Sequence, residues 1–324
     1  MAILGTASLE RFLAFCGDDL GMDASAVTRL GGATFERFWG LPAGCTARAV
    51  LMSVGGSDVG RILGLEFHGG ERRSISDGAP GPFIGYWNLN FYVDGIVARC
   101  AALAERGITF WSRPISHVVA PGAGSPIEAI FLGPDHVAIN LVELAGASGS
   151  TVDELRQETA GLPRSRTGFS QVATSAHATR DIEAAIEFHR EVLGMRPTID
   201  TILESPQVNA LTGRPAHART RVVWMRGDHP YGKVALSQAL NYPLVDRASE
   251  AAAPAIGYLA QGFAVHDLAR ALRIAADCGA VPRQDPESLE LAPGLSVMAA
   301  TLRAPGSGAL LLLMQAAGGR SGLT

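Results

Sequence analysis

The stretch EFHREVLGM, residues 187–195, has a weaker copy in AFCGDDLGM, residues 14–22. In and before it, apolar residues recur at intervals of three and four, the spacing of one face of a helix. Gly194 then takes the place of a C-cap, because glycine readily adopts the left-handed conformation that ends many helices. His189 of one copy matches Cys16 of the other, and different residues at one repeat position indicate packing rather than chemistry. The stretch therefore predicts a helix, and its copy predicts a repeated unit.

The repeat extends far beyond this helix. With residue 9 placed over residue 182, residues 9–67 match residues 182–240 without a gap. After the helix come segments with the β-branched content and turn-bounded length of strands, such as ARTRVVWMRG at 218–227. The unit is therefore predicted to be β-α-β-β-β. The identical pairs include Glu10/Glu183, Phe15/Phe188, Leu20/Leu193, Gly21/Gly194, Met22/Met195, Arg48/Arg221, Val50/Val223 and Met52/Met225.

Two further segments fit the same template. Residues 88–110 and 257–282 each read as a strand, a helix rich in small and apolar residues, a stop at glycine and another strand. We therefore predict four modules, in two domains of two consecutive modules each, joined by a linker rich in Gly, Ser and Pro. Thr151 and Glu154 have the spacing of a capping box, which predicts a short helix in this linker. The modules span about 1–68, 84–146, 167–241 and 255–316, the domains are 1–147 and 167–324, and the linker is 148–166.

The composition is that of a globular protein with little net charge. Of the 324 residues, 47% are hydrophobic, and the formal net charge is −4. Because the sequence has no basic stripe and no apolar run of membrane-spanning length, we expect no nucleic-acid or membrane partner and a cytoplasmic location. The cysteines are too scattered for a zinc motif, so we expect reduced, buried thiols. They are Cys16, Cys45, Cys100 and Cys278.

The helix and hairpin sequences resemble those of the vicinal oxygen chelate superfamily. The resemblance rests on DIEAAIEFHREVLGM at 181–195 and GPDHVAINLVE at 133–143, and through the four modules it covers nearly the whole chain. It implies an α+β fold of four βαβββ modules, paired into two domains with cupped mixed β-sheets. The superfamily includes glyoxalase I, epimerases, extradiol dioxygenases, fosfomycin-modifying enzymes and metal-free bleomycin-binding proteins, so function must be argued from the site.

Metal-using members of this superfamily hold a divalent ion with a histidine from the first strand of a module and a glutamate from its last strand. At every matching position this chain has a different residue type. We therefore expect no standard metal site and no cofactor. The first strand of module one is at most the segment MAIL at 1–4, so this module is either incomplete or completed by a neighbouring chain in a homodimer. The matching positions are Met1, Asn88, Thr174 and Ala260 on first strands, and Leu63, Asn140, Leu236 and Leu311 on last strands.

Two asparagines occupy both ligand positions of module two. Alternation along a strand places Asn88, Asn90 and Tyr92 on one face, where Asn140 of the last strand joins them. Such amides can hold a carbonyl, amide or hydroxyl group of a small-molecule ligand, or they can satisfy each other or a water molecule. We interpret all of these residues as candidates for substrate contact, with Asn140 as a catalytic residue.

His117 is the titratable residue that we nominate as general acid or base, because its strand is expected to wall the same cup. A purely structural role is the alternative. Arg48 can clamp a carboxylate, or it can serve an ion pair inside its own module, since Arg221 stands at the same repeat position. In module three, Thr174 and Trp224 are further candidates for substrate contact in a mostly apolar cup.

Three functions remain open. The first, which we favour, is a metal-independent isomerase or lyase acting on a small organic carbonyl compound, with Asn88 and Asn140 binding its oxygen and His117 moving a proton. The second is a non-catalytic protein that binds or sequesters a small molecule, of the bleomycin-resistance kind. The third is an extradiol dioxygenase or glyoxalase with relocated metal ligands.

Overall fold

A computed structural model describes residues 1–316; the end of the predicted second domain, 317–324, lies outside the described residues. This part of the chain has an α+β fold with two curled mixed sheets, a ten-stranded sheet one and an eight-stranded sheet two. Sheet one contains β1 (Ala2–Gly5), β2 (Asp23–Ala24), β3 (Thr28–Gly31), β4 (Thr46–Ser53), β5 (Ile62–His68), β14 (Gly257–Ala264), β15 (Val281–Pro282), β16 (Glu287–Ala292), β17 (Leu295–Arg303) and β18 (Leu310–Ala316). Sheet two contains β6 (Gly85–Tyr92), β7 (Ile115–Ser116), β8 (Ile127–Leu132), β9 (Ala138–Glu143), β10 (Val172–Ala178), β11 (Arg196–Leu203), β12 (Thr220–Arg226) and β13 (Lys233–Ala239).

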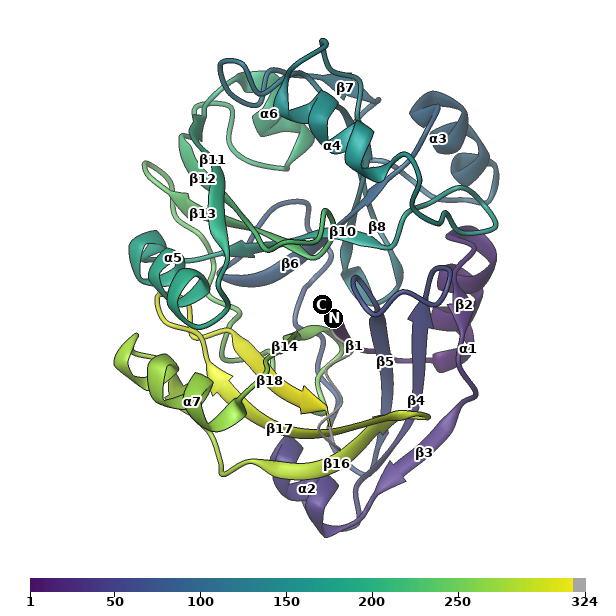
Figure 1. Cartoon of the computed structure of the whole chain (residues 1–324). Coiled ribbons are helices and arrows are strands. Elements are labelled where there is room, and N and C mark those ends of the chain that lie inside the picture. Colours follow the sequence, from purple (N-terminus) through teal and green to yellow (C-terminus); the bar gives the residue numbers. More distant parts are fainter. Residues whose placement is uncertain (317–324) are drawn as a thin grey trace.

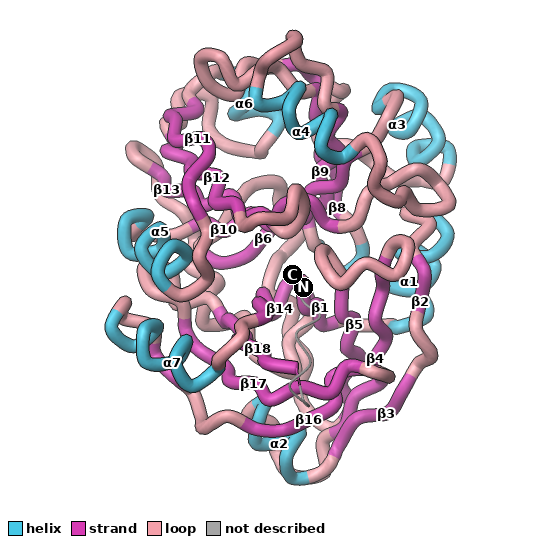
Figure 2. The backbone as a smooth tube through the Cα atoms, in the orientation of Figure 1, coloured by secondary structure: helices cyan, strands magenta, loops and turns pink. Residues whose placement is uncertain are grey.

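The helices flank and cap these sheets. In Figure 1, α1 and α3 lie on one side of the molecule and α5 and α7 on the other, while α2 lies at the end of sheet one and α4 and α6 at the end of sheet two. Figure 2 shows the same arrangement of helices around strands. The bounds are α1 (Leu9–Leu13), continued as a π-helix over Ala14–Asp19, α2 (Ala33–Trp39), α3 (Ile96–Glu105), α4 (Thr151–Thr159), α5 (Ile182–Glu191), α6 (Pro206–Leu211) and α7 (Leu268–Asp277), with a 3₁₀ turn over Pro134–His136.

The repeated helix begins and ends as its sequence predicts. The side chain of Asp181 caps α5 by accepting a hydrogen bond from the amide of Ala184 at 3.1 Å. Gly194, just beyond the helix, has a φ of 64°, which a residue with a side chain rarely adopts. His189 and Cys16 are 1% and 2% exposed, in agreement with the packing role expected of them.

Each sheet joins modules from distant parts of the chain. The strand order is β15-β17-β18-β14-β1-β5-β4-β2 in sheet one and β11-β12-β13-β10-β6-β9-β8-β7 in sheet two. In sheet one, module one meets module four, where Ala2 pairs with Gln261; in sheet two, module two meets module three, where Phe91 pairs with Val172. The predicted pairing of module one with two and of three with four is therefore wrong, because a repeat shows which segments are equivalent and not which edges meet. The boundaries 1–147, 148–166 and 167–324 stay predictions.

The first strand of module one is short, as expected, but the module is not incomplete. β1 runs parallel to β5 on one side and antiparallel to β14 on the other. Module four of the same chain therefore completes this part of the sheet, and a homodimer stays a prediction.

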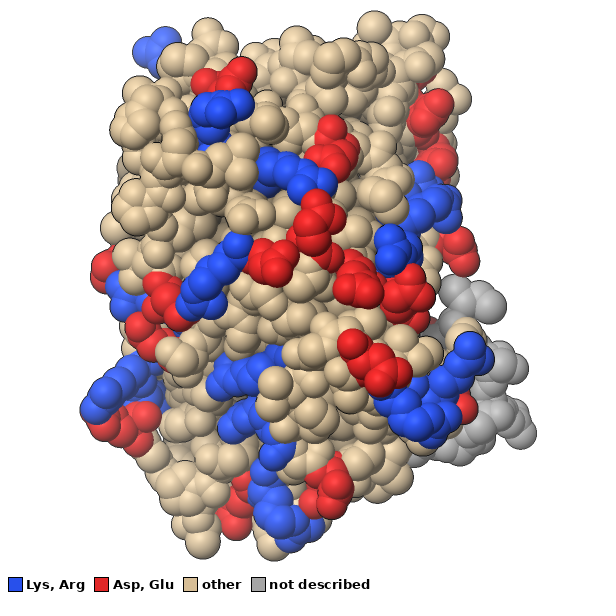
Figure 3. Space-filling model, turned by 90° about the vertical axis from the view of Figure 1, so that its left-hand side faces the viewer, with Lys and Arg blue, Asp and Glu red and all other residues tan. Residues whose placement is uncertain are grey.

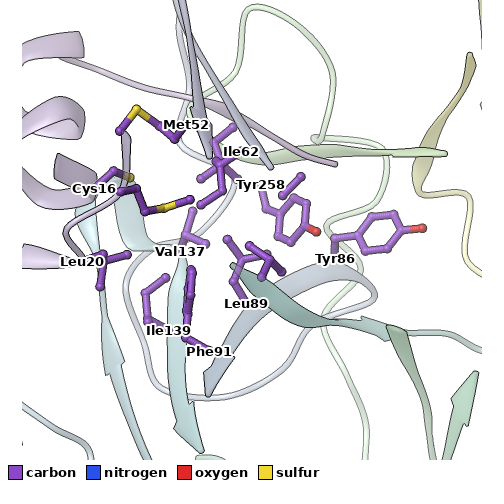
Figure 4. Packing of buried hydrophobic residues seen from close by; sticks show 14 of the residues in the cluster. Cys16, Leu20, Met52, Ile62, Tyr86, Leu89, Phe91, Val137, Ile139 and Tyr258 are labelled. Carbon is purple, nitrogen blue, oxygen red and sulfur yellow. The ribbon is translucent and has the colours of Figure 1, made fainter. Parts of the chain in front are cut away.

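One hydrophobic core is shared by the two sheets. It draws side chains from both sheets and from α1, α3, α5 and α7. Figure 4 shows part of this core. Leu89 and Phe91 of β6 lie beside Ile139 of β9 and Val137, which directly precedes β9. Tyr86 of sheet two stacks on Tyr258 of sheet one, with ring centroids 5.2 Å apart. Each large apolar side chain buried in this way stabilises the fold by about 1.5–3 kcal/mol, so we expect the sheets to unfold together.

The two cups differ in how their capping helices fill them. Helix α2 packs aromatic side chains against sheet one, with the Trp39 ring 6.1 Å from that of Phe67. Helix α6 occupies the same repeat position in sheet two but carries smaller side chains, so a cavity remains there. Phe35, Phe38 and Trp39 of the first helix correspond to Val208, Leu211 and Thr212.

The repeat is not gapless throughout. In module one Leu51 pairs with Leu63, whereas in module three Trp224, which is equivalent to Leu51, pairs with Ala235. The hairpin of module three is thus one residue shorter, and every side chain after it changes face relative to the ungapped match. Leu236, expected in the cup, packs instead with Ile182 on the helix side.

Helix α4 confirms that the predicted linker contains a short helix, although its cap is shifted. Ser150, and not Thr151, is the N-cap, and its hydroxyl accepts a hydrogen bond from the amide of Asp153 at 3.2 Å. Asp153 in turn accepts a bond from the amide of Gly149 at 2.9 Å. The two capping residues, Ser150 and Asp153, therefore lie one position earlier than the predicted pair, Thr151 and Glu154.

The surface has mixed charge on the face shown in Figure 3, where basic and acidic side chains are interspersed. Among residues 1–316, no helix has both the length and the apolar character needed to cross a membrane.

Candidate functional site

A cavity of about 150 Å³ lies inside the curl of sheet two, covered by α4 and α6. An apolar cavity of similar volume in another protein holds benzene, so the space suits a compound of that size. The wall combines apolar side chains from every part of the sheet with a few polar and charged groups. The polar and charged residues among its lining are Asn88, Asn90, Tyr92, His117, Glu128, Asn140, Thr151, Thr174, Thr198, Thr212, Arg214, Arg226, Lys233 and Ser237.

The candidate residues from the sequence converge on this cavity, with one exception. Alternation along β6 brings its polar side chains to the concave face, β9, β10 and β12 contribute Asn140, Thr174 and Trp224, and His117 directly follows β7. Asn88 and Asn140 are only 2% and 5% exposed, so their amides are held inside the wall. The candidates that line the cavity are His117, Asn140, Asn88, Asn90, Tyr92, Thr174 and Trp224.

Arg48 is the exception, and its predicted role in substrate binding is corrected here. It lies on β4 of sheet one, where its guanidinium pairs with Glu10 of α1 at 2.6 Å and with Glu66 at 3.0 Å. In module three, Arg221 makes the equivalent pair with Glu183 of α5. Both partners recur in the repeat because this ion pair ties the helix of each module to its sheet, which was the alternative reading of Arg48.

His117, Glu128 and Asn140 form a connected group on the wall made by module two. The Oε1 atom of Glu128 lies 3.0 Å from Nε2 of His117, and its Oε2 atom accepts a hydrogen bond from Nδ2 of Asn140 at 2.6 Å. Antiparallel pairing places Glu128 beside Ile115, near His117, and two residues along β8 from Ile130, the strand partner of Asn140. A single carboxylate therefore orients both the imidazole and the amide.

The electrostatics of this group favour an ionised Glu128. Burial alone raises the pKa of Glu128, but the bonds from His117 and Asn140 and the positive charge of Arg214 lower it more, to a value below 4.5. Burial also lowers the pKa of His117, while the hydrogen bond and charge of Glu128 raise it, with a net increase above 6.5. An imidazole that is held by a carboxylate can both accept and release a proton.

Several buried polar atoms around the cavity have no hydrogen-bond partner among residues 1–316. They include donors and acceptors, whereas most buried polar groups in proteins are paired. Asn140 donates one N–H of its amide to Glu128, and its carbonyl oxygen has no partner among the described residues. These atoms are Nδ2 of Asn88, Oδ1 of Asn90, Oδ1 of Asn140, Nδ1 of His117 and Nε and Nη1 of Arg214.

Four charged residues that line the cavity were not identified from the sequence, and Arg226, which pairs with Glu158, is one of them. Glu128 is the one charge in the otherwise apolar strand Ile127–Leu132, a signal that was available. Arg214 stands where module one has Leu41, and the sequence offers no reason for it to be 9% exposed. Lys233 is the single lysine of the chain and begins β13.

The positions that match the superfamily's metal ligands do not form a metal site. Leu236 and Leu311 point to the helix side, and Ala235 and Leu312 take the cup-facing places, so two positions were misassigned by one residue. Among the described residues, no three His, Cys, Asp or Glu side chains gather as metal ligands. The cavity offers one His–Glu pair and neutral amides together with the cation Arg214, which repels a divalent ion. The donor set therefore does not fit a metal.

Solved structures resemble this one over nearly its whole length, although no protein-family model and no curated protein matches the sequence. Glyoxalase I from Zea mays aligns over 97% of this chain and 90% of its own, with a TM-score of 0.60 and 14% identity. A proposed dioxygenase from Bacillus subtilis aligns over 98% of this chain and 84% of its own, with a TM-score of 0.53 and 12% identity. The chain therefore has the two-sheet fold of the vicinal oxygen chelate superfamily, as its repeated helix and hairpin sequences predict.

Proposed function

We propose that the protein is a metal-independent isomerase or lyase that acts on a small organic carbonyl compound in the cavity of sheet two. The observation that carries this proposal is the group in which Glu128 holds both His117 and Asn140 beside unpaired hydrogen-bond donors. The volume of about 150 Å³ limits the reacting part of the substrate to a few non-hydrogen atoms.

In this proposal His117 moves the proton. With Nε2–H donated to the Glu128 carboxylate, the lone pair of the ring lies on Nδ1, which has no partner among residues 1–316. Nδ1 removes a proton from the carbon next to the carbonyl group of the substrate. In an isomerase the proton is then returned to the other face of that carbon or to a different atom. In a lyase, removal of the proton assists the loss of a leaving group. Glu128 stays ionised and stabilises the imidazolium, as a carboxylate does in other carboxylate–histidine pairs.

The developing enolate oxygen needs donors, and the cavity provides them. Nδ2 of Asn88 and Nε and Nη1 of Arg214 are buried N–H groups without partners among the described residues. Donors fixed in a site that excludes water stabilise a developing negative charge more than water does. Asn140, whose amide N–H is engaged by Glu128, acts as a positioning residue and offers its carbonyl oxygen to a hydroxyl of the substrate.

The test is a comparison of variants on a substrate found by screening small aldehydes, ketones and oxo acids. His117→Gln should lower kcat by about 10²- to 10⁴-fold, the usual contribution of a general base. Asn140→Leu should lower kcat by at least about 10-fold, because it frees one oxygen of Glu128. Arg48→Gln, a change outside the cavity, is the matched control and should keep the wild-type kcat.

Binding measured by calorimetry separates catalysis from sequestration. Retained binding with lost turnover in His117→Gln supports the proposal. Wild-type turnover by both Asn140→Leu and His117→Gln contradicts it, as does a wild-type protein that binds carbonyl compounds tightly and converts none of them. The last result supports the non-catalytic binding function.

A further inference from the structure

Lys233 is a second chemical feature of the same cavity and has no part in the proton transfer proposed above. It is the single lysine of the chain, it lies on the cavity face of β13, and it is 3% exposed. A buried lysine ordinarily needs a carboxylate partner, because an unpaired buried charge is costly. Among residues 1–316, Lys233 makes no ion pair.

The repeat sharpens this contrast. Once the one-residue slip is included, Lys233 corresponds to Arg61 of module one. Arg61 pairs with Asp58 and donates to the carbonyl of Ser57 at 2.9 Å, so its charge is neutralised. Lys233 has the same place on its strand, but module three supplies no such carboxylate.

The surroundings of Lys233 favour the neutral amine. Its Nζ donates to the carbonyl oxygen of Pro230 and lies 5.1 Å from the centroid of the Tyr92 ring, which also lines the cavity. These two contacts suit the charged form, but burial and a neighbouring cation outweigh them. Burial and the nearby charge of Arg226 lower the pKa of Lys233 to about 7, against a weaker opposing effect of Glu158. Arg226 is itself paired with Glu158 at 2.7 Å, so that carboxylate is already engaged.

We propose that Lys233 is an amine nucleophile that captures an aldehyde or ketone in the cavity as an imine. The neutral amine attacks the carbonyl carbon, the carbon–oxygen π pair moves to oxygen, and a proton passes from nitrogen to that oxygen to give a carbinolamine. Loss of water then forms the carbon–nitrogen double bond, and addition of water reverses both steps. No oxidant or reductant takes part.

This inference shares the cavity with the proposed function but does not require His117. A neutral carbonyl compound suits the site because most of the side chains that line the cavity together with Lys233 are apolar or aromatic, such as Tyr92 and Trp224. Capture by Lys233 can therefore hold a substrate, or a reactive aldehyde, whether or not proton transfer follows.

The experiment uses propanal as the carbonyl probe and cyanoborohydride as a reductant that fixes the imine as a propyl amine. The intact protein is treated at pH 7, digested and mapped by mass spectrometry. A reference lysine is introduced by Arg270→Lys, because Arg270 is exposed and forms no ion pair within the described residues. The α-amino group of Met1 is a competing amine outside the cavity, bonded to the carbonyl of Gly262 at 2.8 Å, and it is also neutral at pH 7 because burial and the charge of Arg61 lower its pKa to about 5.

We expect the propyl group on Lys233. A lysine with a pKa of about 7 is about half neutral at pH 7, whereas an ordinary lysine is neutral in about one molecule in 3,000. Even if burial slows access tenfold, labelling of Lys233 should exceed that of the reference lysine by about 100-fold. The difference should shrink as the pH approaches 10, where the reference amine also loses its proton.

Two variants complete the test. Lys233→Arg keeps the positive charge but should lose the label, and circular dichroism checks that it folds. His117→Gln should label at the wild-type rate, so failure of the proton-transfer mechanism and failure of this inference are distinguishable. Equal labelling of Lys233 and the introduced lysine at pH 7, or a label confined to the α-amino group, overturns the inference without any need for Lys233→Arg to fold.

Discussion

Replacing Glu128 by glutamine tests the group at the centre of the site without changing its shape. In the wild type, one carboxylate oxygen bonds to His117 at 3.0 Å and the other accepts from Asn140 at 2.6 Å. A glutamine amide has one acceptor oxygen and one donor nitrogen. It can therefore accept a hydrogen bond from His117 or from Asn140, but it does not offer a separate acceptor oxygen to each of them. The variant also leaves Arg214, which is 9% exposed, without the nearest negative charge.

The expected loss of stability follows from the charged hydrogen bond. Hydrogen bonds to charged groups contribute about 1.5–3 kcal/mol, and both His117 and Glu128 are largely buried, with side chains 7% and 16% exposed. We therefore expect Glu128→Gln to lower the free energy of unfolding by about 2 kcal/mol near pH 5.5.

The pH dependence has a definite sign. The raised pKa of His117 gives stability that is present below about 6.5 and is lost as the pH rises through the folded-state value. The lowered pKa of Glu128 gives stability that is present above about 4.5 and is lost as the pH falls through its folded-state value. The pair is therefore most stabilising between pH 4.5 and 6.5, and the difference between wild type and variant should shrink by pH 8.

Urea unfolding at pH 5.5 and pH 8 measures this difference, and NMR titration of His117 checks its cause. In Glu128→Gln the pKa of His117 should fall, because burial, the largest effect on it, is then opposed only by a weaker backbone hydrogen bond at Val118. Glu154→Gln makes the same substitution on an exposed residue of α4 and should leave both measurements unchanged. A stability difference as large at pH 8 as at pH 5.5, or an unchanged His117 titration, would refute the reasoning.

Three further predictions concern the cups, the buried histidines and Arg48. Phe38→Ala should cost about 3–5 kcal/mol in urea unfolding, because Phe38 is fully buried in the filled cup; Leu211→Ala, its repeat equivalent beside the cavity, should cost less, and an equal cost would show that the two cups are packed alike. Burial lowers the pKa of His189 to about 4, so the unfolded chain takes up this proton at a higher pH than the folded protein does. The folded protein therefore loses stability as the pH falls from 6.5. His189→Phe should remove about 2 kcal/mol of the stability lost between pH 6.5 and 4.5, and an unchanged pH dependence would place the titration elsewhere. Arg48→Gln should leave the ligand affinity measured by calorimetry unchanged, and weaker binding would show that Arg48 contributes to ligand binding.

Local patterns in the sequence were sufficient for the elements but not for their assembly. Helical spacing, Asp181 and Gly194 specify α5, because a helix and its caps depend on neighbouring residues. The contact between Ala2 and Gln261 depends on two strand edges at opposite ends of the chain. No local periodicity encodes that choice, so the modules were paired in the wrong order.

The same distinction holds for the candidate site. Alternation along β6 places Asn88, Asn90 and Tyr92 in one wall, and that prediction needed only the pleat of a strand. Lys233 and Glu128 face the cavity because of strand register across hairpins, and a hairpin shorter by one residue exchanges the two faces of β13. Register of this kind is determined by turn length and by packing against other modules.

The central claim is that the cavity catalyses proton transfer without a metal, and exchange of substrate hydrogen for solvent deuterium tests it most directly. Protein stripped with a chelator is incubated in deuterium oxide with small carbonyl compounds, and the signal of the hydrogen next to the carbonyl group is followed by NMR. We expect the substrate hydrogen to exchange with deuterium in the chelator-treated wild type and not to exchange in His117→Gln. Exchange that requires an added divalent ion, or that continues at the wild-type rate in His117→Gln, would contradict it.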